Sequence, residues 1–384
     1  MTNHTKHQPC NVLILTGSIG SGHVSVAHAI EEALRRTAGK KCSVETIDFV
    51  SSSNFVTNAT KTFYLNSLKI SPRIWEMIFN HSSDSDLPLK FLNAISAPFL
   101  QQKFLELIEE KKPSVLVSTF PVWDILIKKS WEKYSGGKLP FVSVITDSIS
   151  VHNAWTIGNP DYFFVSNEDT KVSLKNLGIP EEKILAFGYP VSRKFCACKP
   201  QTDFYEHFQL SPKKRTLLLI LSTGMNWAKV KKIAQKLQET KLKNIQVAII
   251  NAANKRWTEK LSKMKWPIGK RITGWTNEMH KFIHGSDIIL TKAGGATVVE
   301  CIESKKPMII IDVIPGQEIG NAMLVQKYNL GVVLNKDLDN FDTAIEYIFN
   351  NQGLIEKNLE SQRRPEAADD IAKFLINLCK LTKT

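Results

Sequence analysis

The sequence predicts two doubly wound α/β domains, each built on a parallel sheet with helices on both faces. Short apolar runs alternate with amphipathic stretches along the chain, and most runs end in glycine-rich or polar turns. A turn-rich stretch near residues 196–212 separates two such series. With 384 residues, 43% of them hydrophobic, the chain is long enough for two cores. We expect domains at 1–199 and 200–365, and a final amphipathic helix at 366–384 that packs back on the first domain.

In the first domain, unbroken apolar runs indicate buried parallel strands. The predicted strands are 11–15, 44–47, 115–119, 141–145 and 162–165. The third ends at Ser118-Thr119 and the fourth leads into Thr146-Asp147. Because the carboxyl ends of parallel strands lie at one edge of a sheet, we expect these side chains to meet the loop that follows the first strand.

That loop is rich in glycine and ends in a histidine. Residues 16–22 read Thr-Gly-Ser-Ile-Gly-Ser-Gly, and His23 starts an amphipathic helix. The loop lacks the Gly-Lys-Ser/Thr of a Walker motif and the full dinucleotide fingerprint. The positive end of a helix lowers the pKa of a histidine below about 6.5, so His23 is expected to be neutral and able to accept a proton. A capping histidine without chemistry is the alternative interpretation.

The second domain repeats the pattern. Its predicted strands are 216–221, 247–250, 288–290, 308–312 and a short one at 330–332. The turn after 288–290 reads Thr-Lys-Ala-Gly-Gly and opens a helix, so bare backbone N–H groups can approach an anion there. Glu300 lies one helical turn beyond Ala296, where a carboxylate can accept two hydrogen bonds from a ribose diol. The alternative is a turn that needs small residues, beside a solvated Glu.

These motifs carry a family resemblance. Thr-Lys-Ala-Gly-Gly-Ala-Thr-x-x-Glu followed by Pro-Gly-Gln-Glu-x-x-Asn resembles the donor site of the glycosyltransferases grouped with the peptidoglycan GlcNAc transferase. The pattern is most similar to that of the diacylglycerol sugar transferases, which include glucosyldiacylglycerol and monogalactosyldiacylglycerol synthases. Their first loop also resembles Gly20-Ser-Gly22-His23. The resemblance implies the GT-B architecture, in which two such domains face each other across a cleft.

The resemblance also implies roles for individual residues. His23 corresponds to the base that deprotonates the acceptor hydroxyl, and Asp147 is expected to orient that base or to bind the acceptor. Thr-Asp-x-x-x-x-His-x-x-Trp resembles the acceptor-side signature, although a structural role is equally open for its histidine. The expected acceptor-loop residues are Gly20, Gly22, His152 and Trp155. The expected donor-binding residues, with Trp275 at the uracil, are Ser222, Thr223, Gly224, Trp275, Lys292, Gly294, Gly295, Ala296, Thr297, Glu300, Gln317, Glu318 and Asn321.

One turn departs from the family. Many relatives have a run of glycines after the first strand of the second domain, whereas this chain has Ser222-Thr223-Gly224 with a single glycine. The diphosphate site is therefore expected to be tighter or altered. The basic helix that follows carries Lys229, Lys231, Lys232 and Lys236, and we interpret it as a solvated face, with phospholipid contact as the alternative.

Composition restricts the cellular setting. The chain contains no apolar run near the roughly 20 residues of a membrane-spanning helix and no signal peptide, so we expect a cytosolic protein whose six cysteines are reduced. A net charge of +13 suits an anionic membrane surface, and no nucleic-acid module is recognisable. Aromatic and cationic residues are interleaved through 54–107. This pattern is typical both of ordinary core helices and of segments that contact a membrane, and the family resemblance favours membrane contact for part of the region. Asp84-Ser85-Asp86 is interpreted as a solvated turn, so no metal or other cofactor is expected.

The predicted activity is an inverting transfer of a hexose from UDP-glucose or UDP-galactose to diacylglycerol at a membrane surface. A GlcNAc transferase that acts on a polyprenyl-linked acceptor is one alternative. A nucleotide-sugar-binding protein without turnover is another, because of the reduced glycine loop at 222–224.

Overall fold

The computed structural model describes residues 10–18, 22–48, 98, 101–131, 139–197, 204–222, 224–251, 254–316 and 318–381. These residues divide into two compact units. The described residues up to Ser192, together with those from Glu366 onward, form the first, and the described residues of Arg193–Pro365 form the second. The first boundary thus precedes the predicted position at residue 199, and the turn at 188–192 closes the first unit.

The first unit contains a parallel sheet in the order β2-β1-β3-β4-β5-β6. Its strands are β1 (Cys10–Thr16), β2 (Cys42–Asp48), β3 (Val115–Ser118), β4 (Phe141–Val144), β5 (Tyr162–Phe164) and β6 (Ile184–Leu185). All the predicted strands are present, and β6, with only two residues, was not predicted. Because β1 lies between β2 and β3, the chain reverses its direction of winding at the β1/β3 boundary.

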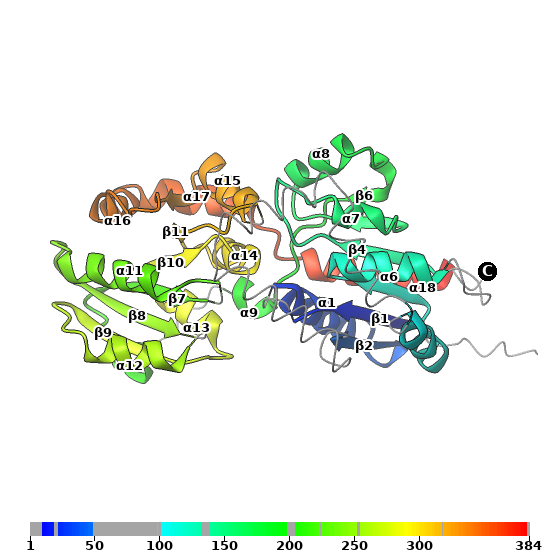
Figure 1. Cartoon of the computed structure of the whole chain (residues 1–384), viewed down its shortest axis with the longest axis horizontal. Coiled ribbons are helices and arrows are strands. Elements are labelled where there is room, and N and C mark those ends of the chain that lie inside the picture. The colour runs from blue at the N-terminus through cyan, green and yellow to red at the C-terminus, as the bar shows by residue number, and fades with distance from the viewer. Residues whose placement is uncertain are drawn as a thin grey trace, which may run out of the picture. The chain divides into compact units, whose positions relative to one another are not determined.

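Helices cover both faces of this sheet (Figure 1). They are α1 (Gly22–Ala38), residues 101–111, α6 (Pro121–Trp131), α7 (Ala154–Ile157), α8 (Glu168–Asn176) and α18 (Ala367–Leu381), with short 3-10 turns η1 (Gly39–Lys41) and η2 (Glu181–Lys183). Leu13 and Leu15 of β1 pack with residues of 101–111 and α6, whereas α1 and α18 pack on β1 and on each other. Alternate side chains of β1 therefore enter different cores.

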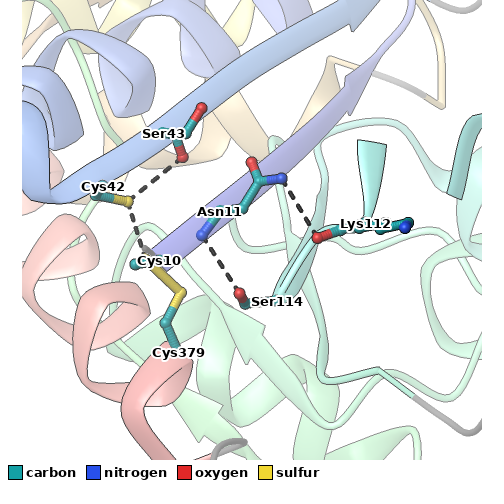
Figure 2. Close-up of a disulfide and its surroundings, with 7 residues drawn as sticks. All are labelled: Cys10, Asn11, Cys42, Ser43, Lys112, Ser114 and Cys379. Atoms are coloured by element: carbon teal, nitrogen blue, oxygen red, sulfur yellow. Dashed lines mark hydrogen bonds between the residues drawn. A yellow bond between two sulfur atoms is a disulfide. The ribbon is translucent and has the colours of Figure 1, made fainter. Parts of the chain in front are cut away.

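The C-terminal helix α18 is part of the first unit and is tied to it covalently. Cys379 in its last turn forms a disulfide with Cys10 at the start of β1, and the Cys42 thiol donates to Cys10 Sγ over 2.9 Å (Figure 2). Arg36 of α1 donates to Asp369 of α18 over 2.5 Å. The prediction that all cysteines are reduced is wrong for Cys10 and Cys379, because a pairing between residues 369 positions apart leaves no local signal.

The second unit contains a parallel sheet in the order β12-β11-β10-β7-β8-β9. Its strands are β7 (Arg215–Leu221), β8 (Ile245–Asn251), β9 (Gly269–Thr273), β10 (Ile288–Lys292), β11 (Met308–Asp312) and β12 (Gly331–Val333). The edge strand β9 was not predicted. Gly331 is required in β12, since an added Cβ would lie 1.8 Å from the Met308 carbonyl oxygen.

The helices of this unit follow the strands in turn, and Figure 1 shows them on both sides of the sheet. They are α9 (Arg193–Cys196), α10 (Phe204–His207), α11 (Trp227–Glu239), α12 (Lys255–Lys263), α13 (Met279–Gly285), α14 (Gly295–Glu303), α15 (Ile319–Lys327), α16 (Phe341–Asn350) and α17 (Gln352–Gln362). Side chains of Asn226 and Asn254 cap α11 and α12 by accepting from backbone N–H groups of the first turn.

Several predictions fall outside the described residues. Most of 54–107, including Asp84-Ser85-Asp86, lies there, as do Gly20, Thr223 and Gln317. Of the helices in the described ranges, none has both the length and the apolar character needed to cross a bilayer.

Candidate functional site

The candidate functional residues of the first unit gather where its sheet changes winding direction. His23 follows β1 by way of the glycine loop, and Thr119 follows the neighbouring strand β3. Thr146 lies just beyond β4, the next strand in the sheet. The contacts of His23 with both threonines show that these strand ends lie beside the start of α1, the helix that follows the glycine loop. Such a switch point is where ligands bind in doubly wound sheets.

The imidazole of His23 is held by groups without net charge. Its Nδ1 lies 2.7 Å from the Thr119 carbonyl oxygen and 3.1 Å from Thr146 Oγ1. A carbonyl can only accept, so Nδ1 carries the proton and the neutral ring keeps its lone pair on Nε2. Phe120 packs edge-on against the ring at 4.9 Å between centroids. Burial lowers the pKa of His23 to about 4, against the opposing effect of the Thr119 hydrogen bond.

Asp147 supports the same region through Trp155 rather than through the histidine. The indole Nε1 of Trp155 donates to Asp147 Oδ2 over 2.8 Å, and burial raises the pKa of this carboxyl to about 6. Trp155 is 1% exposed and packs with Ile145 and Phe163 in a hydrophobic cluster. Trp155 is therefore a core residue whose ring centroid lies 6.2 Å from that of His23, and its side chain is not exposed to contact an acceptor.

The other predicted residues of this region are parts of the backbone framework. Gly22 is the first residue of α1. His152 accepts a hydrogen bond from the Ala154 N–H through Nδ1 over 3.1 Å and so helps to start the short helix α7. Of the two interpretations of His152, this contact favours the structural one.

In the second unit, the predicted donor turn joins β10 to α14. Gly294 caps α14, and Gly295, Ala296 and Thr297 form its first residues. The backbone N–H groups of this first turn have no partner within the helix and are available to an anion. An added Cβ on Gly294 would lie 3.4 Å from Lys292 Nζ, so the lysine head group lies beside this turn.

Charged and amide side chains from α15 and the loop before it close around the turn. Lys292 forms an ion pair with Glu318, which is 4% exposed and also accepts from the Ile314 N–H over 3.0 Å. Asn321 Nδ2 donates to the Ala293 carbonyl oxygen over 2.9 Å. The two motifs on which the resemblance depends are therefore brought together by the fold.

Glu300 lies in the second turn of α14 and has unusual electrostatics. Burial raises its pKa to about 8, so the side chain is largely protonated at neutral pH in the absence of a ligand. A ribose diol can still be bound, because deprotonation then supplies the acceptor oxygens. The role assigned to Glu300 is accordingly linked to pH.

The remaining donor residues lie at the ends of β7 and β9. Ser222 follows β7, and Gly224 has a φ of +95°, which a glycine adopts without strain. Trp275, in the loop after β9, is 74% exposed, so its ring is available to stack on a base. Since β7 is next to β10, Ser222 and Lys292 lie at neighbouring strand ends, at the switch point of this sheet.

The sequence did not identify one charged residue at the donor edge of the second unit, nor two neutral groups that contact His23 in the first unit. Lys229 was interpreted as part of a solvated face, yet its side chain is 13% exposed and its Nζ lies 3.7 Å from Asp312 Oδ1. Thr119 and Thr146 were placed at the correct edge but were not assigned to His23. A lysine in the first turn of a helix that follows a strand was the available signal for Lys229, because helical side chains point back toward the N-terminus.

Comparisons with known proteins agree with these motifs. A family model described as monogalactosyldiacylglycerol (MGDG) synthase matches residues 23–191, and the glycosyltransferase family 28 C-terminal domain matches residues 222–373. The processive diacylglycerol beta-glucosyltransferase of Bacillus cereus (strain AH187) is 27% identical over 370 residues, which cover 95% of this chain and 93% of that protein. The protein of the same name from Bacillus thuringiensis (strain Al Hakam) is 26% identical over 369 residues.

Solved structures share the fold at low sequence identity. Medicago truncatula UGT71G1, complexed with UDP-glucose, is 12% identical with a TM-score of 0.62, covering 97% of this chain and 98% of that one. The S. aureus MnaA–UDP structure is 14% identical with a TM-score of 0.63, covering 96% and 97%. The predicted fold class, two doubly wound domains of the GT-B type, is confirmed. The two family models match residues 23–191 and 222–373, and the chain is similar to diacylglycerol glycosyltransferases along most of its length.

Proposed function

We propose that the protein transfers a hexose from a UDP-sugar to the hydroxyl of diacylglycerol, with inversion at the anomeric carbon. The observation that carries the chemical part of this proposal is the neutral imidazole of His23, with Nδ1 bonded to the Thr119 carbonyl oxygen. The names of the relatives at 26–27% identity support the substrate classes and make glucose the first sugar to test.

The reaction divides between groups of the two units. Nε2 of His23 takes the proton of the acceptor hydroxyl as its oxygen forms a bond to the anomeric carbon. The bond from that carbon to the UDP oxygen breaks, and UDP leaves with the electron pair. Its added negative charge is stabilised by the backbone N–H groups at the start of α14 and by Lys292. We propose that these groups act without a metal ion.

Membrane association is part of the same proposal. A diacylglycerol hydroxyl lies at the surface of a bilayer, so a transferase must reach it there. The net charge of +13 attracts the protein to anionic lipid headgroups at moderate salt. We propose peripheral attachment from the cytoplasmic side.

The decisive experiment supplies purified protein with a panel of labelled UDP-sugars and with vesicles that contain diacylglycerol, and resolves the lipid products. The expected result is labelled glycosyldiacylglycerol with UDP-glucose or UDP-galactose, and UDP release that depends on diacylglycerol. Vesicles carrying a polyprenyl-linked acceptor form a parallel arm. Label in that acceptor alone, or UDP binding with no release over either lipid, would contradict the proposal in favour of one of the two alternatives.

A further inference from the structure

A second lysine, Lys229, reaches the strand ends beside the donor turn. Lys229 lies in the first turn of α11, the helix that follows β7, and its backbone N–H donates to the Asn226 cap. Its side chain runs back over the strand ends, where Nζ lies 3.7 Å from Asp312 Oδ1 and 3.3 Å from the Lys336 carbonyl oxygen. Lys232, three residues later on the same helix, forms an ion pair with the exposed Asp337 instead.

This placement of Lys229 is costly for a lysine. Burial lowers its pKa, the nearby Lys232 charge adds to the effect, and the carboxylate of Asp312 opposes it. At 3.7 Å, the contact with Asp312 is longer than a hydrogen bond, so the ammonium group is paired in charge but keeps donor capacity. An ammonium group held in this way can turn to an incoming anion with little rearrangement.

Asp312 connects Lys229 to the donor turn. It is the last residue of β11, its Cα pairs in register with Lys292 of β10, and its carbonyl oxygen accepts from the Ala293 N–H over 2.9 Å. Lys229 and Lys292 therefore bring their positive charges to adjoining strand ends. Each has one carboxylate partner, so the edge is balanced in charge when no anion is bound.

Two polar atoms at this edge have no partner within the described part of the chain. They are Ser222 Oγ, at the end of β7, and Asn321 Oδ1, beside the turn after β10. Buried polar atoms without partners are rare in folded proteins and often mark a site that a ligand or water completes. Here they border the strand ends to which the two lysines point.

We propose that Lys229 is a ligand of the nucleoside diphosphate, which it binds together with Lys292. The assignment rests on the proposed function in one respect, namely that the donor is a nucleoside diphosphate sugar. Diphosphate oxygens attract the ammonium group more strongly than one carboxylate does, so Lys229 moves from Asp312 to the ligand or is shared between them.

The test compares calorimetric binding of UDP and of uridine by wild-type protein and by Lys229→Met, which keeps the aliphatic length. Loss of one charged phosphate contact should weaken UDP binding about tenfold, while uridine binding stays within about twofold. Lys232→Met, on the same helix, is the matched control and should bind both as wild type does. Lys229→Arg should restore most of the UDP affinity, because it restores the positive charge.

A second variant guards against a folding defect in Lys229→Met. Asp312→Asn removes the competing carboxylate, so it should leave UDP binding intact or tighten it up to about fivefold. Equal loss of UDP and uridine affinity in Lys229→Met, or unchanged UDP affinity, overturns the assignment and leaves the proposed function standing. Failure of the wild-type protein to bind UDP overturns both. Loss of binding to anionic vesicles with normal UDP binding would assign Lys229 to phospholipid and overturn the proposal as well.

Discussion

The two units place their candidate functional residues at the same topological position but surround them with different electrostatics. At the β1/β3 edge, His23 is bonded to a carbonyl and a hydroxyl and is packed against Phe120. At the β7/β10 edge, two lysines are paired with two carboxylates. The difference matches the tasks proposed for them, since a base must stay uncharged to accept a proton, whereas a diphosphate site needs cations that are already compensated when empty.

The largest effect that tests this contrast is expected from His23→Ala. Removal of a general base should lower kcat by about a hundredfold or more, while calorimetry should show unchanged UDP affinity because the donor groups lie in the other unit. His28→Ala, an exposed histidine of the same helix α1, is the matched control and should keep full activity. Full turnover in His23→Ala would remove the residue from the mechanism and with it the proposed division of tasks.

The features that could be predicted from the sequence are those that depend on residues close together in the chain. The strands and their glycine turns are local patterns, so the residues from Thr291 to Asn321 could be read directly. Strand β9 (Gly269–Thr273) was missed because it is a half-exposed edge strand without an apolar run.

The missing parts of the candidate sites depend on distant contacts. The carbonyl of Thr119 that fixes the proton of His23 belongs to a residue 96 positions away, and Asp312, whose carboxylate pairs with Lys229, is also distant from it in the sequence. The Cys10–Cys379 disulfide is the extreme case. A single sequence shows which residue types end each strand, but the order of strands in the sheet decides which of those ends are neighbours.

A smaller effect is expected on uridine binding from Glu300, which, unlike the two lysines of the second unit, has no oppositely charged partner among the causes of its pKa shift. Its pKa, raised to about 8 by burial, means that deprotonation must accompany ribose binding if the carboxylate accepts both hydroxyls. Affinity for uridine should therefore rise about fivefold between pH 7 and pH 8, because the ionised fraction of the carboxyl rises by that factor. The change should reverse when the pH is lowered and the carboxyl takes up its proton. Uridine is the suitable probe since it lacks a titrating phosphate.

The comparison variant for this prediction is Glu300→Gln. It should bind uridine about tenfold more weakly than wild type at pH 8, and its affinity should not change with pH. Glu356→Gln, an exposed substitution on α17, should retain the wild-type affinity and its dependence on pH. The same rise with pH in Glu300→Gln would assign the titration to another group.

The smallest effect, and the sharpest test of the contrast between the two edges, is the response of turnover to acid. Because burial lowers the pKa of His23 to about 4, its lone pair stays available down to about pH 5. Asp147, with a pKa near 6, titrates inside the window, so kcat is best followed in Asp147→Asn, whose amide oxygen can still accept from Trp155. In that variant, kcat at saturating donor should change by less than about twofold from pH 8 to pH 5 and then fall with a midpoint near 4.

A solvated histidine would instead lose about nine-tenths of its unprotonated form by pH 5.5. Activity recovered on return to pH 7 separates titration from unfolding, and a reversible midpoint near 6.5 would show that the His23 edge lacks the desolvated, neutral character that distinguishes it from the donor edge.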